Sequence, residues 1–252
     1  MEFRQPPAAA PRSTLRPMTH PELLSAFRTD PFALLGKIPG VWPVWKPPGP
    51  TSHDLVLRAR RALGEKRVGH AGTLDPMAEG VLALLAGGAS RLFDEFQAFP
   101  KRYRARLRWG LRTDTQDAAG RPLADWRPAR DPAGLTAAEV EAALGAFRGD
   151  ILQTPPMYSA LKRGGRPLHR LARAGLTVER AARPARAHEI ALTVFDAAAG
   201  EAEFLMAVAS GFYVRTFIDD LGLALGVGAT MTALTREAVG PFDRSRCLGE
   251  IS

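Results

Sequence analysis

The chain has 252 residues, 46% of them apolar and 24% charged, a composition typical of a globular protein with one large domain or two modest ones. Its net charge of +8 favours a polyanionic partner. One cysteine excludes an internal disulfide and a multi-cysteine zinc site, and no apolar run is long enough for a membrane span, so we expect a cytoplasmic protein without a membrane partner.

The beginning of the chain is expected to form an N-terminal extension over residues 1–40. Its first 20 or so residues are rich in Pro, Ala and Arg, which is typical of segments without fixed structure. A short helix is predicted over His20–Leu35, because Thr19 suits its N-cap and Pro21 its first turn. We therefore expect the ordered body of the protein to begin near Gly40.

A strand and two helices are predicted next. The strand covers residues 41–45, and the proline within it indicates a sheet edge. A helix follows over residues 51–63, because a threonine and a serine can cap it and its apolar residues recur on one face. After a glycine-containing loop, Asp75 and Pro76 predict the start of a second helix that runs to about Leu85.

The remaining elements indicate the fold class. Residues 103–109 alternate with period two, as in a half-buried strand. Helices are predicted over residues 135–147 and the later part of 212–225, and strands over 190–195 and 203–209. Because strands and helices do not alternate in a regular βαβ series, we predict an α+β fold rather than a doubly wound sheet.

The segment Gln153–Gly175 differs from its surroundings, because it is basic and interrupted by prolines and glycines. One interpretation is a mobile arm that contacts a polyanion, and the other is a solvated surface helix. Arginine greatly outnumbers lysine in the whole chain. This excess also has two explanations, a GC-rich genome or selection for phosphate contacts. The basic residues of the segment are Lys162, Arg163, Arg166, Arg170 and Arg173.

Asp75 is the first candidate for a chemical role. An Asp before a Pro at a helix start is what N-capping requires, so a structural carboxylate is one interpretation. The other is a nucleophile, since Gly69, Gly72 and Gly80 leave space near the backbone and a helix N-terminus keeps a carboxylate ionised. These local features permit a nucleophile without requiring one.

Two motifs around Asp75 resemble the signatures of a known enzyme family. Lys46-Pro-Pro-Gly-Pro-Thr-Ser52 and Gly69-His-Ala-Gly-Thr-Leu-Asp-Pro-Met-Ala-Glu-Gly-Val-Leu82 are similar to the paired signatures of the bacterial TruB family. Three further blocks resemble that family in the same order, and the resemblance covers about residues 41–245. These blocks are Lys101-Arg-Tyr103 with Gly110–Asp117, Gln153–Lys162 with Arg173–Gly175, and Ser210–Arg215 with Asp219–Gly222.

The resemblance implies a pseudouridine synthase, because TruB enzymes isomerise uridine-55 in the T loop of tRNA to pseudouridine. It implies a mixed, mainly antiparallel sheet flanked by helices, with a basic thumb at about 150–180 that grips RNA. No cofactor or metal is expected, because the reaction is an isomerisation and the sequence has no P-loop, dinucleotide fingerprint or metal-ligand spacing. The expected partner is the T-arm stem-loop of tRNA, and the enzyme is expected to act as a monomer without a protein partner.

The resemblance also assigns catalytic roles. Asp75 would attack the flipped nucleotide, either at the ribose carbon or at the uracil ring. Arg215 would pair with its carboxylate, and an opposite charge at contact distance lowers a carboxyl pKa. Tyr103 would stack on the uracil. Taken alone, Arg215 would be a surface or phosphate-binding arginine, and Tyr103 a tyrosine packed on a sheet.

Four further residues would bind the substrate. His70 would occupy the gap left by the extruded base, Tyr213 and Leu234 would line the base pocket, and Lys46 would sit beside it and help to fix the loop. Taken alone, His70 would be structural, Leu234 a core residue and Lys46 an exposed lysine of a proline-rich loop. The basic residues of the thumb would contact the RNA backbone.

The sequence departs from the family in three places. It ends soon after Val239-Gly-Pro-Phe242, so we expect residues 41–252 to form the catalytic domain without the C-terminal PUA domain that many relatives carry. His169 stands where relatives commonly have tyrosine in the thumb. The leading extension of about 40 residues is also unusual, and Met18 is an alternative start within it.

Two other functions remain open at this point. One is a tRNA-binding chaperone that uses the same surface without chemistry. The other is a guide-RNA-dependent enzyme of the related archaeal and eukaryotic group, against which the missing domain argues.

Overall fold

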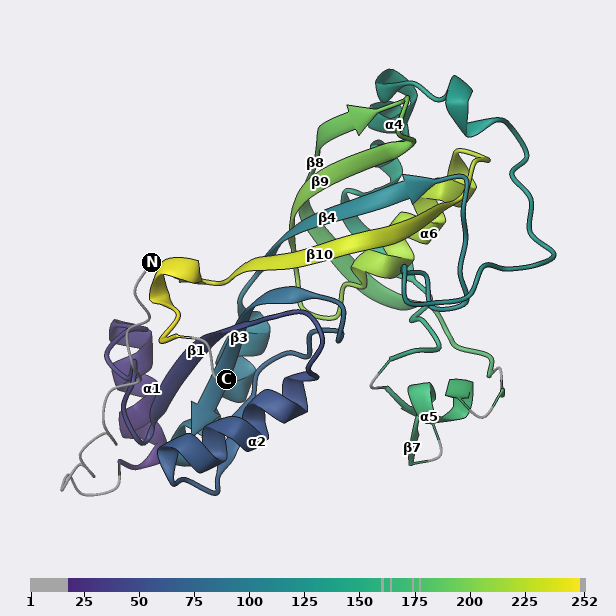
Figure 1. The fold of residues 1–252 in the computed structure, drawn as a ribbon. Helices are drawn as coiled ribbons and strands as arrows, with labels where there is room; N and C mark the ends of the chain where they lie inside the picture. Colours follow the sequence, from purple (N-terminus) through teal and green to yellow (C-terminus); the bar gives the residue numbers. More distant parts are fainter. Residues whose placement is uncertain (1–17, 160, 164, 174, 177, 250–252) are drawn as a thin grey trace. The chain divides into compact units, whose positions relative to one another are not determined.

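The computed structural model describes residues 18–159, 161–163, 165–173, 175–176 and 178–249, and the chain divides into two compact units (Figure 1). The first unit comprises the chain up to Arg102 and from Thr235 onward, and the second comprises Tyr103–Leu234. Strands β4 (Lys101–Trp109) and β10 (Ala229–Val239) contribute residues to both units.

The sheet of the first unit is built around β3 (Glu79–Ala86). Strands β1 (Gly40–Lys46) and β2 (Val68–His70) pair with β3 in antiparallel fashion. Strand β10 pairs in parallel with the first two residues of β3. Strand β11 (Phe242–Asp243) pairs with β10. Since β1 is the outermost strand, the sheet edge predicted from its proline is confirmed.

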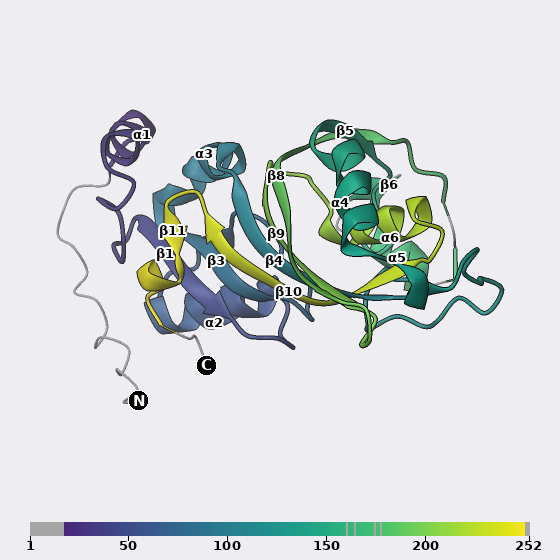
Figure 2. The ribbon, with the colours of Figure 1, turned by 90° about the horizontal axis from the view of Figure 1, so that it is seen from above.

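Alternate side chains of β3 enter two different cores. Val81, Ala83 and Leu85 pack with residues of α1 (His20–Thr29) and α3 (Phe93–Ala98), and the side chains between them pack with α2 (Ser52–Leu63). Figure 2 shows α1 and α3 on one side of these strands and α2 on the other. The helix predicted from Asp75 to Leu85 is therefore wrong, because its continuous apolar run belongs to a strand that is buried on both faces.

The helices at 20 and 51 start as predicted. Thr19 caps α1 and Thr51 caps α2, each in a capping box with the acidic residue three positions later. Helix α1 ends at Thr29 rather than at Leu35, and α2 ends before Gly64, whose left-handed backbone terminates it.

The packed body begins before Gly40, contrary to the prediction. Leu23 and Phe27 of α1 are buried, and the Phe27 ring centroid lies 5.2 Å from that of Phe96 and 6.4 Å from that of Phe242. The extension therefore supplies apolar surface to the first unit, because one face of α1 is apolar. Residues 1–17, which we expected to lack fixed structure, lie outside the described residues.

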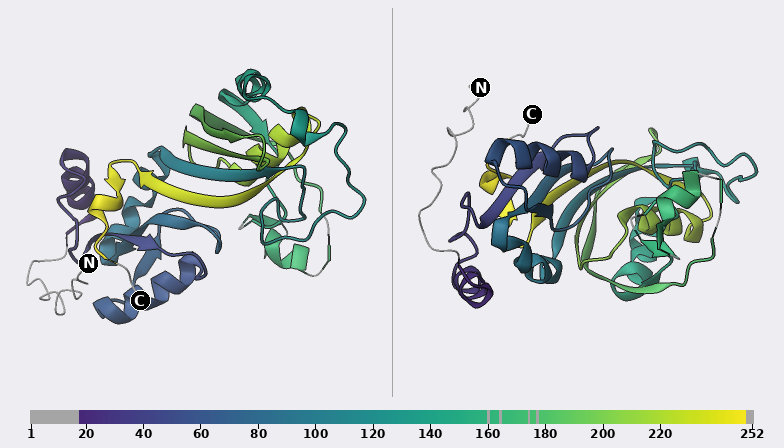
Figure 3. Two further views of the ribbon diagram at one scale, coloured as in Figure 1. Left: turned by 45° about the horizontal axis from the view of Figure 1, so that its top comes forward. Right: turned by 90° about the horizontal axis from the view of Figure 1, so that it is seen from below.

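The second unit is a sheet with strand order β10-β4-β9-β8-β5. Strands β5 (Gly149–Gln153), β8 (Arg183–Asp196) and β9 (Glu201–Val208) pair in antiparallel fashion. Helices α4 (Ala137–Leu144) and α6 (Val214–Ala224) pack in this unit, and Figure 3 gives two further views of it. The Phe217 ring of α6 lies edge-on to Phe204 of β9 with centroids 5.7 Å apart, so α6 covers the sheet.

Several predictions for this unit are confirmed. The strands at 103–109 and 190–195 fall within β4 and β8, and the strand at 203–209 overlaps β9 up to Val208. The helices at 135–147 and 212–225 contain α4 and α6. Strands β5 and β10 were not predicted from the sequence. The mixture of parallel and antiparallel strands with segregated helices confirms the α+β class.

The predicted thumb contains a short hairpin and a helix. Strands β6 (Lys162–Arg163) and β7 (Arg166–Pro167) pair, and α5 (Leu168–Arg173) follows. Arg166 and Arg170 are exposed. The side chains of Lys162, Arg163, His169 and Arg173 lie outside the described residues. Within the described ranges, 3-10 turns lie at η1 (Gly87–Leu92), η2 (Pro132–Gly134), η3 (Gly145–Phe147) and η4 (Arg244–Arg246).

Candidate active site

Asp75 lies in the loop of residues 71–78 between β2 and β3, and its side chain is half-buried. No helix follows it, so neither an N-cap nor a helix dipole explains the residue. The adjacent Leu74 is held by the buried Ser52 at the start of α2. Its N–H donates to Ser52 Oγ at 2.8 Å, and Ser52 Oγ donates to its carbonyl at 3.0 Å. Packing from α2 thus fixes the backbone next to Asp75.

Lys46 is fully buried at the end of β1, although we expected an exposed lysine. Its ammonium donates to the carbonyls of Pro76 at 3.1 Å, Ala78 at 2.6 Å and Pro47 at 3.0 Å. Burial lowers the pKa of Lys46 to about 8, although the nearby Asp75 carboxylate raises it. Lys46 therefore links the proline-rich loop to the loop of Asp75.

Arg236 of β10 is a second buried cation at this loop, and no role was predicted for it. Its Nε donates to the carbonyl of Val81 at 2.7 Å and its Nη2 to that of Gly72 at 3.0 Å. Its sequence neighbours Thr235 and Glu237 are polar, so nothing in the sequence marks Arg236 as a buried residue. Such a residue is hard to assign without the fold, because its partners are backbone atoms far away in the chain.

His70 ends β2 and is half-buried. Its Nδ1 is buried and makes no hydrogen bond with the part of the chain that the structure describes. Burial lowers the pKa of His70 below its usual 6.5, and the positive charges of Arg236 and His53 lower it further. The imidazole is therefore neutral at pH 7, which suits contact with a base better than contact with a phosphate.

The lowered pKa of His70 predicts that the stability of the protein depends on pH. Because the folded protein binds a proton at His70 less readily than the unfolded chain, stability falls as the pH drops through 6.5 towards the lower folded pKa. We expect His70→Gln to lose less stability than the wild type between about pH 7 and pH 5, as measured by urea unfolding. His188→Gln, at an exposed position of β8, is the control. If the wild type and His70→Gln lose the same free energy of unfolding over this pH range, the pKa of His70 is not lowered by folding.

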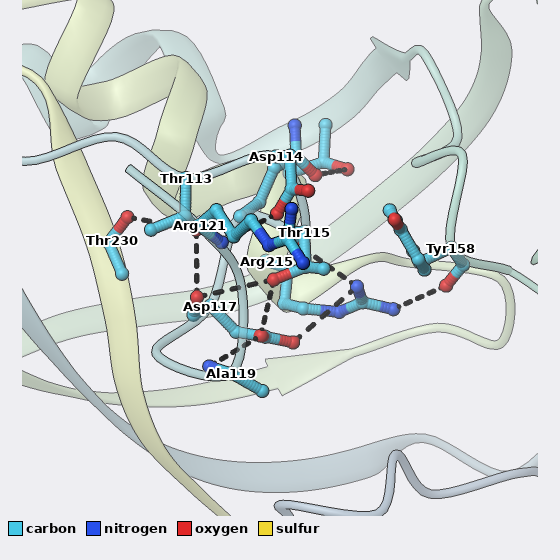
Figure 4. A network of polar contacts seen from close by, with 11 residues as sticks. Thr113, Asp114, Thr115, Asp117, Ala119, Arg121, Tyr158, Arg215 and Thr230 are labelled. Atoms are coloured by element: carbon cyan, nitrogen blue, oxygen red, sulfur yellow. Dashed lines mark hydrogen bonds and ion pairs between the residues drawn. The ribbon is translucent and has the colours of Figure 1, made fainter. Parts of the chain in front are cut away.

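Arg215 is buried near the start of α6 in the second unit. Figure 4 shows its guanidinium between two stretches of backbone: it donates to the carbonyl of Thr115 at 2.8 Å and to that of Tyr158 at 2.8 Å. Its Nη1 lies 3.6 Å from the carboxylate of Asp117, which is also buried. Arg215 is therefore not the surface arginine that it would be taken for on its own.

The loop around Asp117 is fixed by its own side chains. Asp117 accepts from Thr115 Oγ1 at 2.6 Å and from the N–H of Ala119 at 3.1 Å, while Thr113 Oγ1 donates to its carbonyl at 2.7 Å (Figure 4). This loop belongs to the motif Gly110–Asp117, but no role was predicted for Thr113, Thr115 or Asp117. Their dense run of Thr and Asp is the signal that could have pointed to them.

A second ion pair holds the same loop to α6. Arg112 binds the buried Asp219 with two parallel hydrogen bonds, from Nε at 2.7 Å and from Nη2 at 2.8 Å. Gln116 donates to the same carboxylate at 3.1 Å. These bonds raise the pKa of the Arg112 guanidinium. The surroundings of Arg215 are thus held at both ends of the loop.

Tyr213 directly precedes α6 and is half-buried. The buried Gln153 side chain accepts from its N–H at 2.9 Å and donates to its carbonyl at 3.2 Å. Tyr213 and Gln153 line a pocket of about 210 Å³ together with residues of β8 such as Arg183. Of the other residues expected at the base, Tyr103 is half-buried in β4 and Leu234 is buried in β10.

The expected site residues are thus divided between the two units. Lys46, His70 and Asp75 belong to the first unit, and the second unit holds Tyr103, Tyr213, Arg215 and Leu234. The pairing of Asp75 with Arg215 stays a prediction. Among the described residues, no cluster of three His, Cys, Asp or Glu side chains could hold a metal ion, and no helix is long and apolar enough to cross a membrane.

Two family models match the chain. Residues 60–214 match the TruB family pseudouridylate synthase N-terminal domain, and residues 215–249 match the tRNA pseudouridylate synthase B C-terminal domain. The site residues from His70 to Tyr213 fall within the first match, and Arg215 and Leu234 fall within the second.

Individual proteins agree with these models. The chain is 45% identical over 203 residues to a tRNA pseudouridine synthase B of Ralstonia nicotianae, covering 80% of this chain and 63% of that protein. It is 46% identical over 200 residues to one of Heliobacterium modesticaldum, covering 79% and 64%. The chain therefore spans somewhat less than two thirds of the length of these relatives.

The fold is also similar to that of solved structures. A crystal structure of a Cbf5–Nop10–Gar1 complex contains a chain that matches with a TM-score of 0.62 and 29% identity, over 82% of this chain and 50% of that one. Since one family model alone covers more than half of the chain, in agreement with the motifs around Asp75 and Arg215, the chain belongs to the TruB family of pseudouridylate synthases.

Proposed function

We propose that the protein is a tRNA pseudouridine synthase that isomerises uridine-55 in the T loop of tRNA, with Asp75 as its nucleophile. The observation that carries the proposal is that the loop of Asp75, in a chain of the TruB family, is held in one position. Its carboxylate is half-buried, and the backbone on both sides is held by hydrogen bonds from Ser52, Lys46 and Arg236. A nucleophile needs such a fixed position, because catalysis depends on the alignment of the reacting atoms.

The reaction exchanges one bond to the ribose for another. The target nucleotide is flipped out of the RNA, at a cost of a few kcal/mol that stacking and phosphate contacts offset. Asp75 attacks it at the ribose carbon or at the uracil ring; the N1–C1′ bond breaks, the uracil turns, and a C5–C1′ bond forms. The proton on C5 is lost and N1 gains one. Atoms and electrons balance without a cofactor or metal.

The second unit would supply the groups that handle the charge and the base. Arg215 would pair with the carboxylate of Asp75; a guanidinium has five N–H donors, so its bonds to two carbonyls are compatible with a carboxylate partner. Tyr103 would stack on the uracil, and Tyr213 and Leu234 would line its pocket. In the first unit, His70 would fill the gap left in the RNA by the flipped base.

The thumb would contact the phosphates of the RNA backbone, so the affinity for tRNA should depend on the salt concentration. Arg166 and Arg170 are exposed, as phosphate-binding residues must be. We expect tRNA binding to weaken as salt rises, and Arg166→Glu with Arg170→Glu to weaken binding and to flatten that dependence. Filter binding at several salt concentrations measures both effects. Arg127→Glu, an exposed arginine outside the thumb, is the control and should change neither. An unchanged salt slope in the double variant would argue against thumb contacts.

The proposal includes a catalytic domain over residues 41–252 with its thumb at about 150–180, acting in the cytoplasm as a monomer. A guide-RNA-dependent enzyme is the less favoured version. The relatives named tRNA pseudouridine synthase B are about 45% identical to this chain, whereas the Cbf5-containing structure is 29% identical. We therefore expect the protein to need neither guide RNA nor protein partners.

The test uses the purified protein alone with an unmodified tRNA transcript. We expect pseudouridine at position 55 and at no other position, as mapped by chemical sequencing. A transcript with cytidine at that position is the control. If several transcripts are bound but none is modified, the protein is a chaperone or requires a guide, and the proposal is wrong.

A further inference from the structure

Arg236 has an unusual position for an arginine. It is 1% exposed, and among the described residues it is the largest of the fully buried side chains. Its guanidinium reaches over the start of β3 to backbone carbonyls: Val81 accepts from Nε at 2.7 Å, Gly72 from Nη2 at 3.0 Å and Thr73 from Nη1 at 3.5 Å. A buried charge is costly unless its hydrogen bonds are made, so these contacts constrain the side chain.

The backbone of Arg236 is fixed as firmly as its side chain. Arg236 pairs in parallel with Gly80, and Thr235 next to it donates to the Glu79 carboxylate at 3.1 Å. Gly80 has a left-handed φ of 122°, and a Cβ there would overlap the carbonyl oxygen of Arg236. The close approach that glycine permits therefore sets how far the guanidinium extends towards Gly72.

The two buried cations, Arg236 and Lys46, bind the backbone on opposite sides of Asp75. Arg236 binds the carbonyls of Gly72 and Thr73, which precede Asp75, and Lys46 binds those of Pro76 and Ala78, which follow it. We propose that Arg236 is a positioning residue for Asp75, which holds the first half of the loop so that the carboxylate is aimed at the flipped nucleotide. This inference rests on the proposed function.

The shape of the side chain explains why it is an arginine. The carbonyls of Val81 and Gly72 are bound by two different nitrogens of one planar group, Nε and Nη2, whereas a lysine would present a single nitrogen to both. The positive charge of Arg236 also acts on two other candidate site residues, because it lowers the pKa of both Lys46 and His70.

The experiment separates rate from binding. With saturating enzyme and tRNA, we expect Arg236→Lys to lower the single-turnover rate of pseudouridine formation by about 100-fold, because a loop displaced by about 1 Å misaligns the nucleophile. The Kd for tRNA should stay within about threefold of the wild-type value. Arg148→Lys is the matched control, since Arg148 also donates from Nε and Nη2 to a carbonyl, that of Ile190, but lies in the other unit. Its rate should not change.

A second measurement does not depend on activity. Hydrogen exchange of the Leu74 and Ala78 amides should be faster in Arg236→Lys than in the wild type at a temperature where both remain folded. Gly72→Ala is a second variant that disturbs the same loop, since an alanine is strained at the φ of 106° that Gly72 adopts and the carbonyl bound by Arg236 must shift. It keeps the test decisive if Arg236→Lys does not fold.

The outcomes are distinct. An inactive wild type overturns the proposed function, and the exchange rates then still report whether Arg236 holds the loop. With an active wild type, an unchanged rate in the folded variant overturns the positioning role, and so does a loss of rate that follows only from weaker tRNA binding. Equal exchange of the loop amides in wild type and variant overturns it as well.

Discussion

Asp75→Asn is expected to abolish pseudouridine formation while leaving tRNA binding nearly unchanged. Asparagine has almost the same shape, so the hydrogen bonds that Ser52, Lys46 and Arg236 make to the backbone of the loop should persist. It lacks the negative charge and the nucleophilic oxygen, so the covalent step cannot occur. We expect the rate to fall by more than about 10⁴-fold, as is typical when a nucleophile is removed.

Tritium release from C5-labelled uridine in tRNA measures this rate directly, because the C5 proton leaves during the isomerisation. The Kd for tRNA should stay within about threefold of the wild-type value. Asp131→Asn is a suitable control, because Asp131 only caps the turn η2 through the N–H of Ala133. If Asp75→Asn releases tritium at the wild-type rate, another residue is the nucleophile.

Gly80→Ala is expected to have the largest effect on stability. At a φ of 122°, side chains are strained, and the added Cβ would overlap the carbonyl oxygen of Arg236 and lie 2.6 Å from its nitrogen. Both neighbours are backbone atoms of a parallel strand pair, so neither can move without breaking the pairing of β3 with β10. We expect a loss of about 3 kcal/mol or more in the free energy of unfolding.

Urea unfolding followed by circular dichroism provides the measurement. The matched control is Gly69→Ala, in β2 of the same unit, where an added Cβ would meet no atom within 4 Å. That change should alter the free energy of unfolding by less than about 1 kcal/mol. A Gly80→Ala protein that unfolds at the same urea concentration as the control would show that the close approach is not a constraint.

Local signals in the sequence were enough where a structure depends on neighbouring residues. The caps at Thr51 and Thr136 are followed three positions later by an acid, and α2 and α4 begin there. The period-two alternation of 103–109 likewise predicted β4, because one face of that strand is buried. Prediction failed at β3, since an apolar run that is buried on both sides has the period of neither a strand nor a helix.

The candidate site was predictable to a similar degree. Asp75 and Arg215 were selected as candidates through motifs that belong to a family, and the helix that Asp75 was expected to cap is absent, because β3 follows its loop. Arg236 and the carbonyls that it binds were missed, because backbone acceptors leave no signature in a sequence. The burial of Lys46 was missed for the same reason.

The contacts that fix the loop of Asp75 differ widely in how far they reach along the chain. Ser52 lies 22 residues from its partner and Lys46 lies 30 and 32 residues from two of its partners, whereas Arg236 lies 155 and 164 residues from the carbonyls that it binds. Such long-range contacts form late, because closing a large loop costs chain entropy. During synthesis on the ribosome, the loop of Asp75 would therefore gain its final position only after β10 has emerged, so that a nascent chain without β10 carries an unfinished site.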